Sequence, residues 1–179
     1  MLASAALSVW MKCIPMDSGD IKFATMDVRV PAHKAKPSDE KNLEWAKKVW
    51  KMHADGKDAE LPWKEMELTT EVARARRIIN MENHADFHDL PLYAFAIGKS
   101  LAFGGFPGEP FNDIGKAVKK NSPFTLTILS CLTNGSRGYF PFSDAYVGGG
   151  YESATSPFGP TVADDLIKGQ GELLGKLYK

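Results

Sequence analysis

The chain has 179 residues, of which 44% are hydrophobic and 25% are charged. This composition is typical of a globular protein, and the length suits one domain or a large part of one. Lys and Arg together number 22, as do Asp and Glu, so the formal net charge is zero. A nucleic-acid-binding surface needs a basic excess, so the balance argues against that class while leaving neutral or amphipathic small ligands open. The sequence contains no run of about 18 apolar residues, so no transmembrane helix is predicted.

Three helices are predicted in the first half of the chain. The apolar residues between positions 2 and 12 share one helical face and lack a cationic start, which favours a packed amphipathic helix over a signal peptide. A second helix is predicted over residues 38–53, with Ser38 as its N-cap and Gly56 as its stop. A third begins at Thr69 or Thr70 and carries several arginines on a solvated face.

A strand is predicted between the first two helices, over residues 21–30. Its apolar residues change phase, because Ile21 and Phe23 alternate in one register while Met26 and Val28 alternate in the other. A single extra residue in a strand produces such a shift. The pattern therefore predicts a β-bulge near residues 24 and 25.

The second half of the chain is richer in predicted strands. Apolar runs at 92–97 and 101–106 flank Gly98, which predicts two adjacent strands joined by a tight turn. Pro110 is predicted to open a helix, residues 124–131 read as another strand, and Pro160 opens a final helix. The sequence therefore predicts an α/β (mixed α+β) fold, with a mixed sheet and flanking helices. We interpret residues 1–179 as a single domain or as a large part of one.

Glu109 is the first candidate site residue. It lies between Gly108 and Pro110, after a predicted strand, and the following proline restricts its backbone. Catalytic and metal-binding carboxylates often occupy such loops at a sheet edge. The alternative is a carboxylate that only stabilises the N-terminus of the helix predicted to start at Pro110.

Two tyrosines are the next candidates. Tyr139 follows a predicted buried strand, and Tyr151 lies twelve positions further on, after a run of three glycines. A phenol can ligate a metal or donate a hydrogen bond to a developing oxyanion. The alternative for both is simple packing, with the hydroxyl group in water.

The remaining metal-binding residue types form no convincing cluster. His84 and His88 have the i, i+4 spacing of a zinc site on a helix, but the polar residues around them predict a loop. Cys13 and Cys131 are far apart and are interpreted as buried thiols, with a single disulfide as the alternative. No nucleophile elbow, phosphate-binding loop or dinucleotide fingerprint is present.

Several segments, taken together and in order, resemble the neutral/alkaline (non-lysosomal) ceramidase family. The resemblance covers nearly the whole chain, is clearest from Leu92 onward, and matches the C-terminal portion of that family's catalytic domain. The segments that carry it are Val28–Pro31, Pro107–Phe111, Thr133–Tyr139, Gly150–Ala154 and Phe158–Pro160.

The resemblance implies a zinc amidase that hydrolyses the N-acyl bond of ceramide. It implies that Glu109 and Tyr139 are zinc ligands and that Tyr151 acts on the reacting carbonyl. The family's two zinc-binding histidines lie upstream of the matched region, and no histidine of this chain sits in a matching motif. The chain by itself is therefore expected to be inactive and to need the missing N-terminal part of the domain, or another copy of the chain.

Three functional alternatives stay open at this point. The chain is part of a ceramidase-like zinc hydrolase, a hydrolase for a different N-acyl substrate, or a non-enzymatic binding or assembly module that keeps the fold. The resemblance implies a lipid amide as the substrate and no nucleic-acid partner. Family members are often secreted or membrane-facing, and the sequence itself does not specify a location.

Overall fold

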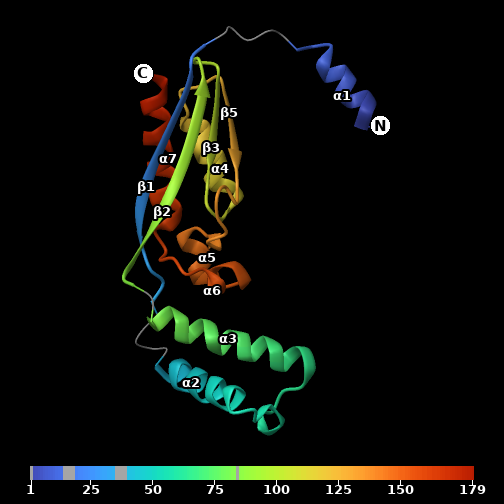
Figure 1. Ribbon diagram of the computed structural model, residues 1–179, viewed down its shortest axis with the longest axis vertical. Helices are drawn as coiled ribbons and strands as arrows, with labels where there is room; N and C mark the ends of the chain where they lie inside the picture. Colours follow the sequence, from blue (N-terminus) through green and yellow to red (C-terminus); the bar gives the residue numbers. More distant parts are fainter. Residues whose placement is uncertain (1, 14–18, 35–39, 84) are drawn as a thin grey trace.

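The computed structural model describes residues 2–13, 19–34, 40–83 and 85–179. Its main body is a four-stranded sheet covered on one face by helices (Figure 1). The sheet contains β1 (Ile21–Pro31), β2 (Phe87–Ile97), β3 (Leu101–Gly105) and β5 (Leu126–Ser130), in the order β1-β2-β3-β5. The β3–β5 pair is parallel and the other two pairs are antiparallel. The predicted α/β class with a mixed sheet is therefore confirmed.

The predicted hairpin in the second half of the chain is present. β2 and β3 pair as antiparallel neighbours, and the turn between them contains Gly98 with a φ of 53°. Only glycine adopts such a positive φ readily, so the residue suits the turn. β2 begins at Phe87, so His88 and Asp89 lie in a strand and not in the predicted polar loop. They are drawn into it because β1 offers a continuous pairing edge as far as Pro31.

The hydrophobic core lies between one face of the sheet and two helices. α7 (Val162–Tyr178) crosses β1 and β2, and α4 (Asn112–Asn121) packs beside α7 and against β5. The long final helix forms despite its three interior glycines because its leucine face is buried. Gly169 also permits close approach, since a Cβ there would lie 2.4 Å from Cγ2 of Val28. The largest fully buried side chains of this core include Phe106, Phe140, Phe158, Leu90, Leu92, Ile114, Leu166, Leu173 and Leu174.

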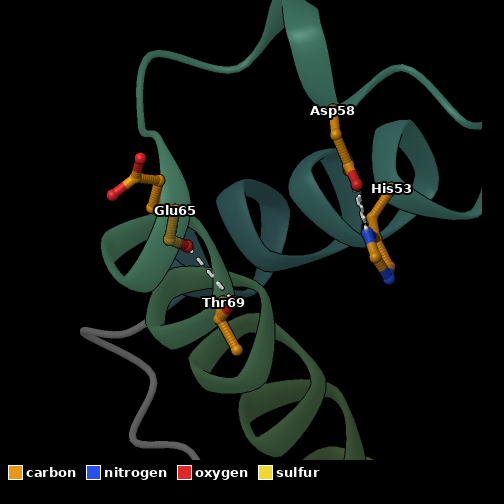
Figure 2. Close-up of polar contacts among 4 residues, drawn as sticks. All are labelled: His53, Asp58, Glu65 and Thr69. Atoms are coloured by element: carbon orange, nitrogen blue, oxygen red, sulfur yellow. Dashed lines mark hydrogen bonds and ion pairs between the residues drawn. The ribbon is translucent and has the colours of Figure 1, made fainter.

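A helical hairpin with a core of its own interrupts the sheet between β1 and β2. α2 (Glu40–Ala54) and α3 (Glu65–Asn83) pack against each other beyond one end of the sheet (Figure 1). Between them, His53 Nδ1 lies 2.9 Å from a carboxylate oxygen of Asp58 in the short helix η2 (Asp58–Glu60) (Figure 2). Figure 2 also shows Thr69 Oγ1 donating to the backbone oxygen of Glu65 at 3.2 Å.

The predicted starts of helices α3 and α4 (Asn112–Asn121) are wrong by a few residues. α3 begins at Glu65, before the predicted Thr69 or Thr70, because the acidic residues of its first turn suit the positive end of the helix dipole. α4 begins at Asn112, so Pro110 belongs to a strand and not to the helix. The predicted N-cap Ser38 and the histidine His84 lie outside the described residues.

The N-terminal helix forms but does not pack. Every residue of α1 (Leu2–Trp10) is exposed, including Leu2 at 90% and Trp10 at 75%. The prediction of a packed helix is therefore wrong for these residues, because none of the other described elements lies against the helix (Figure 1). No helix of the described residues is long and apolar enough to cross a membrane.

The two cysteines also differ from their prediction, in how far they are buried. Both Cys13 and Cys131 are free and exposed, so the prediction of buried thiols is wrong. Cys13 follows the unpacked helix α1, and Cys131 lies just after β5 at the surface. Neither cysteine belongs to the buried core.

Candidate metal centre

A two-stranded parallel ribbon carries two of the predicted site residues. It consists of β4 (Glu109–Pro110) and β6 (Tyr139–Phe140), and its register places Glu109 directly opposite Tyr139. The amide of Glu109 donates to the oxygen of Gly138 at 2.9 Å. Side chains of directly opposed residues lie on the same face of a sheet, so the carboxylate and the phenol leave the ribbon together.

Backbone hydrogen bonds between two loops hold this ribbon in place. The loop after β5 donates from Leu132, Thr133 and Arg137 to the oxygens of Gly108, Phe106 and Pro107, at 2.8–2.9 Å. Gly108 leaves no room for a side chain, because a Cβ there would lie 2.5 Å from the Gly138 oxygen and 2.7 Å from the Phe140 ring. In the motif Phe-Pro-Gly-Glu-Pro, the glycine therefore lets the two backbones approach closely, and this close approach fixes the position of Glu109.

The electrostatics of Tyr139 show that its hydroxyl group lies near negative charge. The Glu109 carboxylate is the largest influence that raises the pKa of the Tyr139 phenol above its usual value of 10.0. Loss of hydration and the nearby Tyr151 and Glu152 raise this pKa further. A negative neighbour opposes formation of the phenolate, whereas a cation at the same place would favour it. The surroundings of the Tyr139 hydroxyl group are therefore negatively charged.

Tyr151 completes the cluster from a different element. It is the first residue of α6 (Tyr151–Thr155), and its ring meets the Tyr139 ring edge to face at a centroid distance of 6.0 Å. Tyr151 is 64% exposed, so most of this residue is open to solvent. The structure thus brings Glu109, Tyr139 and Tyr151 together at an open surface.

Glu109 differs from its prediction in one respect. The sequence suggested a carboxylate on a turn at the start of a helix, but Glu109 lies in β4 and the helix begins at Asn112. The alternative of a helix-stabilising carboxylate therefore loses its basis, because Glu109 precedes Asn112 by three residues and pairs with a strand.

Two residues of this region were not recognised from the sequence. Glu152 adds a second negative charge near Tyr139, and its position directly after Tyr151 could have indicated this. Ser156 is fully buried, and its hydroxyl group donates to the Tyr139 backbone oxygen at 2.9 Å. No sequence signal marks that bond, because it joins residues 17 positions apart.

The three histidines that the structure describes make contacts with other residues. His33 Nδ1 lies 3.1 Å from the Ser156 oxygen, His53 pairs with Asp58, and His88 packs against Phe158. Among residues 2–13, 19–34, 40–83 and 85–179, no three His, Cys, Asp or Glu side chains gather in a way that could hold a metal. A carboxylate and a phenol suit Zn²⁺ chemically, but they are two donors where a zinc site uses at least three protein ligands.

We expect the substitution Glu109→Gln to lower the pKa of Tyr139 towards its ordinary value. The neutral amide removes the largest influence on that pKa, whereas Glu152→Gln removes the smallest and should change it less. Titration of the tyrosine ring carbons by NMR above pH 9 measures both variants. Equal shifts in the two variants would contradict the close approach of Glu109 to Tyr139.

The arrangement of the chain is similar to part of a known enzyme. The neutral ceramidase from Pseudomonas aeruginosa matches with a TM-score of 0.56 and 14% sequence identity, covering 89% of this chain and 29% of that chain. At this identity the likeness shows the fold alone, and the chain spans less than a third of the length of this ceramidase. No family model matches the sequence, and no curated protein matches it.

Proposed function

We propose that this chain is part of a zinc-dependent amidohydrolase that hydrolyses the N-acyl bond of ceramide or a related lipid amide. The observation that carries the proposal is the pairing of Glu109 with Tyr139 on the β4–β6 ribbon, with Tyr151 packed against Tyr139. The fold likeness to a neutral ceramidase supports it. The chain alone is expected to be inactive, because it supplies two of the four proposed ligands.

Each residue has a distinct proposed role. Glu109 and Tyr139 would hold the zinc ion together with two histidines from outside residues 1–179. Zinc, when bound, lowers the pKa of a water molecule and polarises a carbonyl group. Tyr151 would donate a hydrogen bond to the amide oxygen, where negative charge develops. Its exposed position beside Tyr139 allows a substrate to approach both phenols.

The test uses the complete natural protein that contains this chain. We expect Glu109→Ala and Tyr139→Phe to lose zinc, measured by elemental analysis, together with hydrolysis of a fluorescent ceramide. Tyr151→Phe should keep its zinc but lose roughly 10²- to 10³-fold in kcat, as removal of an oxyanion donor does. Full zinc occupancy after combining Glu109→Ala with Tyr139→Phe would disprove the assignment.

Two matched variants control for general damage. Tyr178→Phe removes a hydroxyl group from the far end of α7, and Glu172→Ala removes an exposed carboxylate from the same helix. Both should retain zinc and activity. If the protein contains zinc and hydrolyses other N-acyl amides but not ceramide, the proposed metal site stands and the proposed substrate is wrong.

An assembly module without catalysis is the second candidate. A broad apolar face of the sheet favours it, since apolar surface of that extent marks an interaction site. In that case Glu109→Ala would change neither metal content nor association. The zinc measurement separates the two candidates, because only the hydrolase requires bound zinc.

A further inference from the structure

The face of the sheet that the helices leave open is apolar across all four strands. One row of paired residues runs Phe23, Phe95, Phe103 and Ile128 from edge to edge. The neighbouring row runs Ile21, Ile97, Leu101 and Leu126. Residues that face each other across strands share one side of the sheet, so these eight side chains form a single surface, here called the outer face.

The outer face is accessible in this chain. Phe23 is 66% exposed, Ile21 is 75% exposed and Leu126 is 54% exposed. All three lie on the side of the sheet that faces away from the core. The Phe95 and Phe103 rings stack at a centroid distance of 4.4 Å. Soluble proteins rarely leave a contiguous apolar patch of this kind in water, so the surface indicates an interface.

The apolar character has a clear boundary along the strands. The next row contains Thr25, Tyr93, Gly105 and Ser130, and beyond it Asp27, Arg29 and Asp89 occupy the same side. Arg29 lies over the Phe87 ring at 4.7 Å and is exposed. A covering layer therefore fits over the Gly98 end of the sheet and leaves the end near the helical hairpin in water.

We propose that the outer face is covered by a layer of polypeptide from the part of the catalytic domain outside residues 1–179. This inference rests on the proposed function, which requires ligands from the same outside part. The structural neighbour contains this fold in 29% of its chain, so most of its polypeptide lies outside the matched region. A layer on the outer face would bury both apolar rows.

The helix α1 is too small to take this place. Its nine residues span about 14 Å at 1.5 Å per residue, and a helix is about 10 Å wide. Four strands at about 4.8 Å spacing form a surface wider than one such helix covers. The covering layer must therefore contain several elements, which the outside part of a larger domain supplies.

Thiol labelling tests the proposal in the complete natural protein. With Cys13 and Cys131 replaced by serine, Phe23→Cys and Ile128→Cys place single thiols on opposite edges of the outer face. Lys22→Cys is the matched control, because the neighbouring residue on β1 points to the other side of the sheet. We expect both outer-face thiols to react at least about 100-fold more slowly than the control, and all three to react at similar rates in residues 1–179 alone.

Other outcomes would overturn the proposal. Fast labelling in the complete protein would show an uncovered face. Protection in residues 1–179 that grows with protein concentration would identify a second copy as the occupant, and protection that disappears on deleting residues 1–13 would identify α1. Labelling needs neither zinc nor activity, so an inactive protein with protected thiols would disprove the proposed function and leave this interface standing.

Discussion

If the proposed function holds, replacing Gly108 with alanine is expected to lower the zinc content of the complete protein and to slow ceramide hydrolysis about 100-fold. The new Cβ would meet the Gly138 oxygen at 2.5 Å and the Phe140 ring at 2.7 Å. The oxygen accepts the hydrogen bond from the Glu109 amide, so it cannot move away without separating the strands. A displacement of about 1 Å at a reacting centre costs roughly 100-fold in rate, and the overpacking costs about 1–3 kcal/mol of stability.

Gly171→Ala is the matched control for this substitution. Gly171 lies in α7, and a Cβ added there meets nothing within 4 Å. Alanine favours a helix over glycine by about 1 kcal/mol, so this variant should be as stable as the parent or more stable. Elemental analysis for zinc and a thermal unfolding curve compare the two. Full zinc content in Gly108→Ala would show that the ribbon tolerates the change and that Gly108 does not position Glu109.

Replacing Phe140 with alanine is expected to destabilise the sheet body by about 3–5 kcal/mol. Phe140 has no exposed surface, and its ring packs against the Phe158 ring at a centroid distance of 5.1 Å. Removing it leaves a cavity directly beneath the ribbon that carries Tyr139. Because the whole stability of a domain is about 5–15 kcal/mol, a large part of it would be lost.

Urea unfolding followed by far-ultraviolet circular dichroism measures this loss in residues 1–179. Phe23→Ala is the control, because it removes the same side chain from a position that is 66% exposed and should change the free energy of unfolding far less. Equal losses in the two variants would mean that the outer face is buried in this chain too, and that the core is not where the structure places it.

The regular elements of the fold were largely predictable from the sequence. The β2–β3 hairpin, β5 and α7 follow from apolar runs, a turn glycine and helical spacing, which are local signals. The packing of α1 was not predictable, because an apolar helical face does not say whether the chain offers a surface to receive it. The exposure of Cys13 and Cys131 depends on tertiary packing in the same way.

The phase change in β1 had a different cause from the predicted bulge. β1 pairs with β2 without interruption from Ile21↔Ile97 to Pro31↔Phe87, so no residue is inserted and the bulge is wrong. Phe23 lies on the outer face, whereas Met26 and Val28 face the core. The phase change therefore reflects apolar residues on both faces of one strand, a pattern that is typical of a strand buried on both sides.

The sequence suggested which residues to consider as a site but not their geometry. Tyrosine, glutamate and glycine types at these positions suggested Glu109, Tyr139 and Tyr151. Their convergence depends on a parallel strand pair of two residues each, which is too short to show a period. The Ser156 hydroxyl that holds the Tyr139 backbone arises from the folding of distant segments, and a single sequence contains no record of it.

The separate core of the helical hairpin has a consequence for how unfolding is observed. The chain has four tryptophans. Trp10 lies in α1, Trp45 and Trp50 lie in α2, and Trp63 packs edge to face on Trp45. Intrinsic tryptophan fluorescence therefore reports on these outlying helices, while the sheet body that carries Glu109 and Tyr139 contributes no indole. Two cores of this kind can melt as separate cooperative units, so fluorescence and circular dichroism should give different transition curves.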